Sequence, residues 1–218
     1  MSRKKESQRL YYWDWPGDAP SGHTPLCFEI HANYGLFARP DVSIAVATSY
    51  PVPTWSAAKG MIERIFWRYG GWKINPLGIE VLGPIEFTDY AFNYTGELRR
   101  SDAIARGVNA LFKFQILVNP HYRIIFDVEN GVRDVAEFLS RFSERLMTGD
   151  HASLCMGSSD FMAFAEPASD REISAGFAWH SPLMLKTPHG TDHRTIYFRD
   201  VLLSSGRLIY PFDREVTC

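Results

Sequence analysis

Cationic and aromatic side chains are interleaved in the stretch from Tyr34 to Tyr69, which reads YGLFARPDVSIAVATSYPVPTWSAAKGMIERIFWRY. Binding RNA without reading its bases requires cations for the phosphates and flat rings on which bases stack. The residues of this kind are Arg39, Tyr50, Trp55, Lys59, Trp67 and Arg68. Their grouping predicts a local RNA-binding surface. For any one of them taken alone the alternative is structural, with Tyr50 and Trp55 in the core and Lys59 on a solvated helix face.

A second group with chemical potential is His121-Tyr122-Arg123, which combines an imidazole, a hydroxyl and a cation. Imidazole is the usual acid or base near neutral pH, so His121 is the candidate general base if the protein cuts RNA. Strand alternation, however, places His121 and Arg123 on one sheet face and Tyr122 on the other. This separation argues against the three side chains acting as one catalytic site.

Metal and cofactor sites have little support. His189, Asp192 and His193 in PHGTDHR invite a metal-site interpretation, but two histidines four apart in a Pro/Gly loop lack a third ligand. The three cysteines are widely spaced, which argues against a zinc motif and a disulfide framework and favours the cytosol. No phosphate-binding loop or dinucleotide-binding glycine pattern occurs. We therefore expect no metal and no cofactor.

The bulk composition describes a packed globule. The chain has 218 residues, of which 45% are hydrophobic and 14% aromatic, and its net charge of −2 gives no global attraction to nucleic acid. Any RNA site must therefore be a local basic patch. No apolar run approaches the ~20 residues of a membrane-spanning helix, and MSRKKESQRL lacks the apolar core of a signal peptide. We expect a soluble, cytoplasmic protein.

A helix must position most of the candidate RNA-binding residues. Pro51 and Pro53 remove amide donors and favour extended geometry before them, so the helix begins no earlier than Thr54, its predicted N-cap. Gly70-Gly71 predicts its end. The apolar residues recur at spacings of three and four, which predicts one buried face. They are Trp55, Ala58, Met61, Ile62, Ile65, Phe66 and Tyr69.

Strands are predicted on both sides of this helix. Residues 25–32 alternate apolar and polar side chains, and residues 78–88 are strand-like but broken at Gly83-Pro84. The apolar runs 111–118 and 121–128, joined by Asn119-Pro120, predict an antiparallel hairpin. Between the strand-like residues 78–88 and the run 111–118, residues 89–109 show no period. We interpret 89–109 as a long basic excursion that faces RNA through Arg99, Arg100 and Arg106.

The later segments complete an α+β fold. Residues 132–149 predict a second amphipathic helix and residues 159–167 a returning strand. The resulting order is a ferredoxin-like βαββαβ unit over residues 25–167, which covers one sheet face with helices and leaves the other open, as in RNA-recognition modules. Residues 168–218 predict a small β-rich subdomain. Residues 1–24 are an N-terminal extension that either packs on the domain or reaches a neighbouring subunit or RNA.

The stretch quoted first resembles the N-terminal signature of the CRISPR-associated Cas-five family of the RAMP superfamily, most closely its type I-C branch. The matching motifs are Phe37-Ala38-Arg39-Pro40, the segment from Ser49 to Gly60, and Phe66-Trp67. Weaker similarity continues through HYRIIFDVENG and RDVLLSSGRLIYP. The resemblance implies that Arg39 and Lys59 lie beside the 5′ handle of the guide RNA.

The type I-C branch also contains metal-independent ribonucleases, and the resemblance bears on that activity. Those enzymes are similar in placing a Tyr just before the helix Trp and a Lys-His pair shortly after an Asn/Glu-Gly turn. The corresponding residues here are Phe66, Val132 and Arg133. Phe66 has no hydroxyl and Val132 no charge, so only Arg133 keeps a group useful to RNA. The resemblance therefore implies a cutting site that has been lost.

Two hypotheses follow. The first is a structural subunit of a type I CRISPR surveillance complex (Cascade) in antiviral defence, which caps the 5′ handle of the crRNA and bridges the backbone subunit and the large subunit. Its partners would be crRNA, these two Cas subunits and, indirectly, target DNA. The second is the metal-independent endoribonuclease that processes pre-crRNA in a type I-C system.

Overall fold

The computed structural model describes residues 25–40, 46–66, 73–94, 110–129, 135–187 and 195–217. Among these residues, no helix has both the length and the apolar character needed to cross a membrane. The elements, in chain order, are β1 (Leu26–His31), β2 (Tyr34–Gly35), β3 (Val46–Thr48), α2 (Trp55–Ile65), β4 (Lys73–Val81), β5 (Glu86–Tyr94), β6 (Ala110–Val118), β7 (His121–Glu129), α4 (Val135–Thr148), β8 (Leu154–Cys155), β9 (Met162–Pro167), β10 (Trp179–Thr187), β11 (Ile196–Ser204), β12 (Arg207–Ile209), the 3₁₀ turn η2 (Phe212–Arg214) and β13 (Glu215–Thr217).

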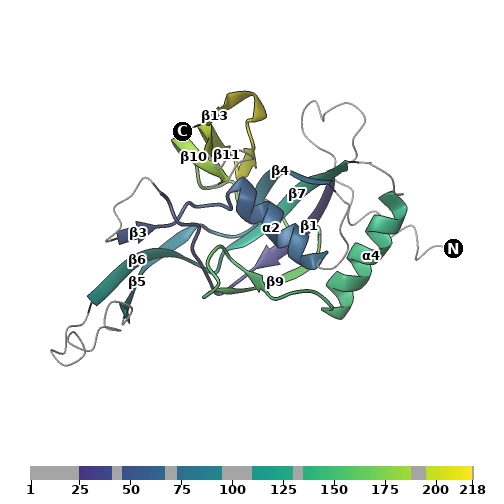
Figure 1. The fold of residues 1–218 in the computed structure, drawn as a ribbon, viewed down its shortest axis with the longest axis horizontal. Helices are drawn as coiled ribbons and strands as arrows, with labels where there is room; N and C mark the ends of the chain where they lie inside the picture. The colour runs from purple at the N-terminus through teal and green to yellow at the C-terminus, as the bar shows by residue number, and fades with distance from the viewer. Residues whose placement is uncertain are drawn as a thin grey trace.

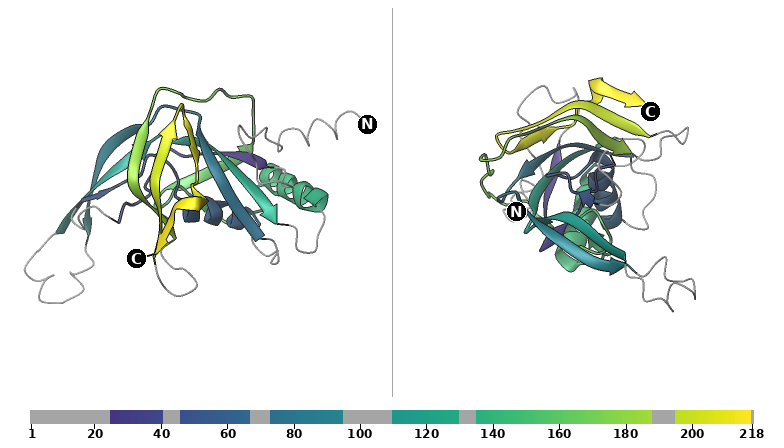
Figure 2. Two further views of the ribbon diagram at one scale, coloured as in Figure 1. Left: turned by 90° about the horizontal axis from the view of Figure 1, so that it is seen from above. Right: turned by 90° about the vertical axis from the view of Figure 1, so that its left-hand side faces the viewer.

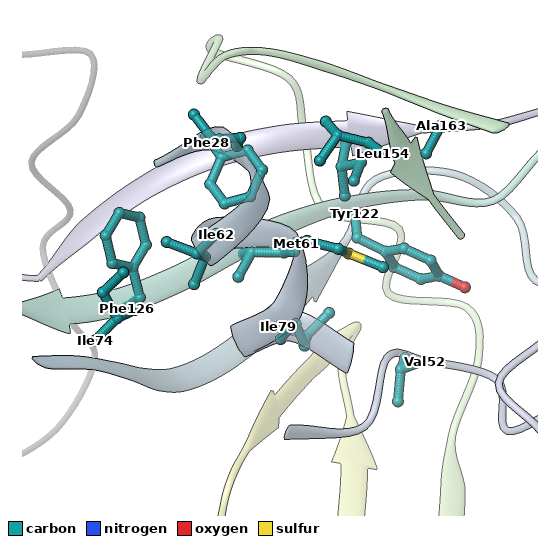
Figure 3. Close-up of a cluster of buried hydrophobic side chains, with 14 of the residues drawn as sticks. Phe28, Val52, Met61, Ile62, Ile74, Ile79, Tyr122, Phe126, Leu154 and Ala163 are labelled. Atoms are coloured by element: carbon teal, nitrogen blue, oxygen red, sulfur yellow. The ribbon is translucent and has the colours of Figure 1, made fainter. Parts of the chain in front are cut away.

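The ferredoxin-like order is confirmed and runs β1-α2-β4-β7-α4-β9. These four strands lie side by side as β4-β7-β1-β9, and each neighbouring pair is antiparallel. Both helices pack on one face of this sheet (Figure 1). Alternate strand residues point toward the helices, and these residues are apolar, so they form the core between sheet and helices. In Figure 3, Met61 and Ile62 of α2 lie against Ile79, Tyr122 and Phe126 of the strands.

Helix α2 begins where the sequence predicts. Its N-cap is Thr54, whose side-chain oxygen accepts a hydrogen bond from the amide of Ala57 at 3.3 Å. The buried face consists of Ala58, Met61, Ile62 and Ile65. The helix ends at Ile65, and the glycine pair predicted as its stop lies outside the described residues.

The predicted hairpin between 111–118 and 121–128 is wrong. Strand β6 pairs with β5, β2 and β3 in a second sheet, whereas β7 pairs with β4 and β1 in the main sheet. Residue Asn119 has a φ of +46° and Pro120 offers no amide, so the short link turns the chain from one sheet into the other. Strand β6 instead finds a continuous antiparallel partner over all of β5.

The pairing of β5 with β6 also changes the interpretation of residues 89–109. Residues 89–94 are the last six of the nine residues of β5 and not part of an irregular excursion. The predicted break at Gly83-Pro84 is confirmed, since β4 ends at Val81 and β5 begins at Glu86. The β5–β6 pair projects away from the main body (Figure 1). Arg99, Arg100 and Arg106 lie outside the described residues.

Strands β10 to β13 follow on the main sheet. Strand β12 pairs with β4, and β10, β11 and β13 continue from it. The buried side chains of Met184, Phe198, Val201 and Leu208 belong to the same core as α2. Whether residues 168–218 form a separate subdomain stays a prediction, as does the extension at 1–24, which lies outside the described residues.

The sheet face opposite the helices is not fully open, contrary to prediction. The β9–β10 connection, residues 168–178, crosses this face (Figure 2). Ala168 packs there on Cys27, Leu77 and Ile125, and the amide of Ser174 donates to the carbonyl of Val81 at 2.8 Å. The face therefore has a covered part and an uncovered part.

Candidate nucleic-acid interface

The structure describes five of the predicted site residues, namely Arg39, Tyr50, Trp55, Lys59 and His121. The others lie outside the described residues, and their predicted roles stay predictions. They are Trp67, Arg68, Arg99, Arg100, Arg106 and Arg133.

Tyr50 is a core residue. Its side chain is 1% exposed, its ring packs edge-on against Trp179, and its hydroxyl accepts a hydrogen bond from the amide of Leu185 at 3.3 Å. The guanidinium of Arg39 lies over the same ring, 5.6 Å from its centroid. Tyr50 therefore offers no free face to a base, and the structural alternative holds for it. Its function in the site is to support the Arg39 guanidinium.

Trp55 organises two lysines at the start of α2. Its indole nitrogen donates to the carbonyl of Pro76 at 3.1 Å, which fixes the ring. The ammonium groups of Lys59 and Lys186 lie 5.2 and 5.0 Å from the ring centroid. Lys186 also forms an ion pair with Glu215, which neutralises part of its charge. We call Lys59 and Lys186 the α2 cation cluster.

Lys186 was missed from the sequence because it is the last residue of the β-rich run LMLK and belongs to no motif. Strand β10 brings it to α2, and Leu185 beside it contacts Tyr50. Within the cluster Lys59 is the accessible cation, since its side chain is 37% exposed and Glu63 lies 3.7 Å away on the same helix. An exposed pair of this kind is weak, so a phosphate can compete with Glu63 for Lys59.

Phe66 lies inside the core. Its ring is 4% exposed and stacks on Phe138 at 4.1 Å and on Phe142 at 5.4 Å between centroids. The residue has no hydroxyl, and its position is closed to solvent. Val132 and Arg133, the other two positions that the resemblance singles out, lie outside the described residues.

A row of charged side chains crosses the main sheet on the face opposite the helices. Glu166, Glu29, Arg123, Glu80 and Arg207 are successive Cα partners on β9, β1, β7, β4 and β12. The guanidinium of Arg123 lies 3.0 Å from Glu29 and 2.8 Å from Glu80, and that of Arg207 lies 2.9 Å from Glu80. The three central side chains are fully buried. Because the two buried carboxylates, Glu29 and Glu80, each have guanidinium partners, the centre of the row is a structural ion-pair network.

The β9–β10 connection is fastened to this row. Glu29 accepts hydrogen bonds from the amide and hydroxyl of Ser169 at 2.7 and 2.9 Å, and Arg123 donates to the carbonyls of Ser169 and Arg171. Burial alone would raise the pKa of Glu29, but the nearby His121 imidazole and the hydrogen bonds from Ser169 and Arg123 outweigh it and lower the pKa from 4.5 to about 2. Glu29 is therefore ionised at neutral pH.

His121 lies at the end of the same face. As predicted, it shares that face with Arg123, whereas Tyr122 is buried on the other and its hydroxyl donates to the carbonyl of Pro51 at 2.7 Å. Nδ1 of His121 is 2.9 Å from a guanidinium nitrogen of Arg171. Since a guanidinium only donates, Nδ1 is the acceptor and Nε2 carries the proton.

This tautomer bears on catalysis. The His121 side chain is 11% exposed, its Nε2 is shielded from solvent, and Nδ1 is engaged by Arg171. Neither ring nitrogen is offered to a 2′-hydroxyl. The geometry therefore does not favour His121 as a general base, although that role stays a prediction.

The same tautomer bears on metal binding. Glu29, His121 and Glu166 place one ligand atom each within 4.8 Å of one another, a spacing compatible with an ion. A metal would need the unprotonated Nε2 that the Arg171 hydrogen bond removes. The guanidinium of Arg171 also lies 3.8 Å from Glu29 and supplies positive charge there. The donor set therefore fits a metal poorly.

Comparison with known proteins gives one consistent picture. No family model matches the chain. The CRISPR pre-crRNA endoribonuclease Cas5d of Thermus thermophilus is 26% identical over 168 residues, which cover 69% of this chain and 67% of that protein. The crystal structure of a CRISPR-associated protein superposes with a TM-score of 0.63 at 14% identity, covering 86% of this chain and 91% of that one.

A functionally uncharacterized protein of Streptococcus mutans also has a TM-score of 0.63, at 16% identity, with 86% and 92% of the two chains covered. At these identities the two solved structures support the fold alone. The sequence relative, together with the signature at the start of α2, supports the family. The chain is thus similar in sequence to a member of the Cas5 family of CRISPR-associated proteins.

Proposed function

We propose that this protein is the RNA-binding subunit of a type I CRISPR surveillance complex, where it caps the 5′ handle of the crRNA and bridges the backbone and large subunits. The observation that carries the proposal is the α2 cation cluster, in which Trp55 holds Lys59 at the exposed side of a rigid helix. Phosphate contacts from such cations position RNA without reading its sequence. Contact with target DNA is indirect, and a cytoplasmic location remains a prediction.

The test is Lys59→Glu, measured as affinity for single-stranded repeat RNA at several salt concentrations. The substitution removes one phosphate contact and adds a repulsion, so we expect weaker binding and a salt slope reduced by about 0.7 to 1. Arg141→Glu is the matched control, because Arg141 is a similarly exposed helix residue paired with Glu137 four residues earlier. Equal effects of the two substitutions would indicate that only net charge matters.

A second candidate is a metal-independent pre-crRNA endoribonuclease. The observation in its favour is the relative named as a pre-crRNA endoribonuclease. Against it stand the buried ring of Phe66 and the engaged nitrogens of His121. A correctly placed acid or base contributes about 10²–10⁴ to such a rate.

We therefore expect the purified protein to bind repeat RNA in EDTA without cutting it. Gel analysis of end-labelled repeat RNA measures this. A single cut that leaves a 2′,3′-cyclic phosphate and is abolished by His121→Ala would replace the binding role with the nuclease role and identify His121 as its base.

A further inference from the structure

Three aromatic rings form a second row across the uncovered part of the sheet face opposite the helices. Phe164, His31 and His121 are successive Cα partners on β9, β1 and β7. The rings of Phe164 and His31 stack at 5.7 Å between centroids, with 28° between their planes, and His31 lies 5.4 Å from His121. The rings therefore stand in a column along the sheet.

One end of this column is open. Strand β8 pairs with β9 only at Ala163 and Met162, and in the described part of the chain no strand pairs with β9 beyond them on that side. Phe164 is consequently 57% exposed although its other face is stacked on His31. A group that covered the exposed part of this ring would gain hydrophobic free energy.

The surroundings indicate what kind of group would cover the ring. At the far end of the column, Arg171 is half-exposed and donates to His121, so a cation is available to a phosphate. On the same face as Phe164, the carboxylate of Glu166 is partly exposed and can accept a hydrogen bond from a base amino group. A purely apolar partner would cover these half-exposed charged groups and remove their water without replacing its hydrogen bonds.

We propose that Phe164 is the open end of a stacking platform that takes an unstacked base of a single-stranded nucleic acid. This inference rests on the proposed RNA-binding function, but it concerns a different surface from the α2 cation cluster. The base would extend the column Phe164–His31–His121, and the strand would direct a phosphate toward Arg171. Stacking of this kind is tolerant of sequence because every base has a π face.

The discriminating variant is Phe164→Leu, which keeps an apolar side chain but removes the ring. We expect roughly 5- to 150-fold weaker binding of fluorescein-labelled repeat RNA. The salt slope should not change, since no charge is removed. Phe164→Tyr keeps the ring and should bind within about twofold of the wild type. Leu202→Ala, at an equally exposed apolar position on β11, is the control and should bind like the wild type.

A photo-crosslink locates the contact independently of affinity. Repeat RNA carrying 5-bromouridine should crosslink within the Met162–Phe164 peptide, as identified by mass spectrometry. The same sequence as single-stranded DNA forms a second arm, and an equal loss with Phe164→Leu on DNA would assign the platform to single strands of both kinds. Melting temperatures of the variants show that they are folded.

The outcomes separate this inference from the proposed function. Suppose that the wild type binds RNA and that Lys59→Glu weakens this binding whereas Phe164→Leu does not. The stacking platform is then wrong, but the RNA-binding function stands. Such a result would leave the exposed ring as a protein-docking position. If the wild type binds neither RNA nor DNA, both proposals fail.

Discussion

Glu29→Gln is expected to destabilise the protein by about 3 kcal/mol at neutral pH. A carboxyl whose pKa falls from 4.5 to about 2 on folding gains about that much folding free energy. The amide keeps an acceptor for Ser169 but removes the charge that lies 3.0 Å from the buried guanidinium of Arg123. Arg123 retains Glu80 at 2.8 Å, so the loss should lie at the lower end of the 3–5 kcal/mol that is typical of a broken buried ion pair.

The pH dependence follows from the direction of the shift. Because the pKa of Glu29 is lower in the folded state, its stabilising contribution is complete above about pH 4.5 and is lost as the pH falls toward 2. The difference between wild type and Glu29→Gln should therefore be largest near pH 7 and shrink below pH 4.5. Urea denaturation at pH 7 and at about pH 3 measures this difference. For a chain of this length, 3 kcal/mol corresponds to about 6–12 °C in Tm.

Glu166→Gln is the matched control, since it removes a carboxylate from the same row at a side chain that is 44% exposed. Its effect should stay below about 1 kcal/mol because exposed ion pairs contribute little. The reasoning is refuted if Glu29→Gln differs from the wild type by less than 1 kcal/mol at pH 7. It is also refuted if the difference persists undiminished at pH 3.

Three further substitutions test local features. Phe66→Tyr should not produce cleavage of repeat RNA, and it should cost about 1–3 kcal/mol by urea denaturation, because its hydroxyl would enter an apolar ring cluster without a partner. Thr54→Ala should cost about 1 kcal/mol through the lost N-cap hydrogen bond to Ala57, and an undiminished Tm would show that the cap contributes nothing. Gly157→Ala should cost more than about 1 kcal/mol, since Gly157 has a φ of +84° and a Cβ there would meet the Leu36 carbonyl oxygen at 2.1 Å; a Tm equal to that of the wild type would contradict the backbone geometry.

The fold was predictable wherever local signals and tertiary partners agree. Helix α2 follows from the prolines before Thr54 and the spacing of its apolar residues. The βαββαβ order follows because segments with the apolar spacing of a strand and segments with that of a helix succeed one another along the chain. The hairpin failed because two β-rich runs joined by Asn119-Pro120 look locally like partners. Strand pairing depends on which strands can pair over their full length. Most of β5 lies in a segment whose sequence has no clear strand period, so β5 was not predicted as the partner of β6.

The site was predictable only where one element carries it. Lys59 and Trp55 are four apart on one helix, so sequence spacing brings them together. Lys186 lies beside them because strand β10 packs near α2, and no local sequence pattern predicts this contact. Glu29 was expected on the polar side of an alternating strand. Its burial follows from the β9–β10 connection that crosses this face, which is a tertiary fact.

The distinction between binding and cutting RNA depends on whether a proton acceptor is within reach of a 2′-hydroxyl. Phe66 has no acceptor and is closed off by Phe138 and Phe142. The hydroxyl of Tyr122 is buried, its pKa is raised by that burial, and it donates to a backbone carbonyl. His121 has one nitrogen held by Arg171 and the other shielded from solvent. By contrast, Lys59 needs only to exchange a weak contact with Glu63 for a phosphate. The described groups are thus better suited to holding an RNA backbone than to breaking it.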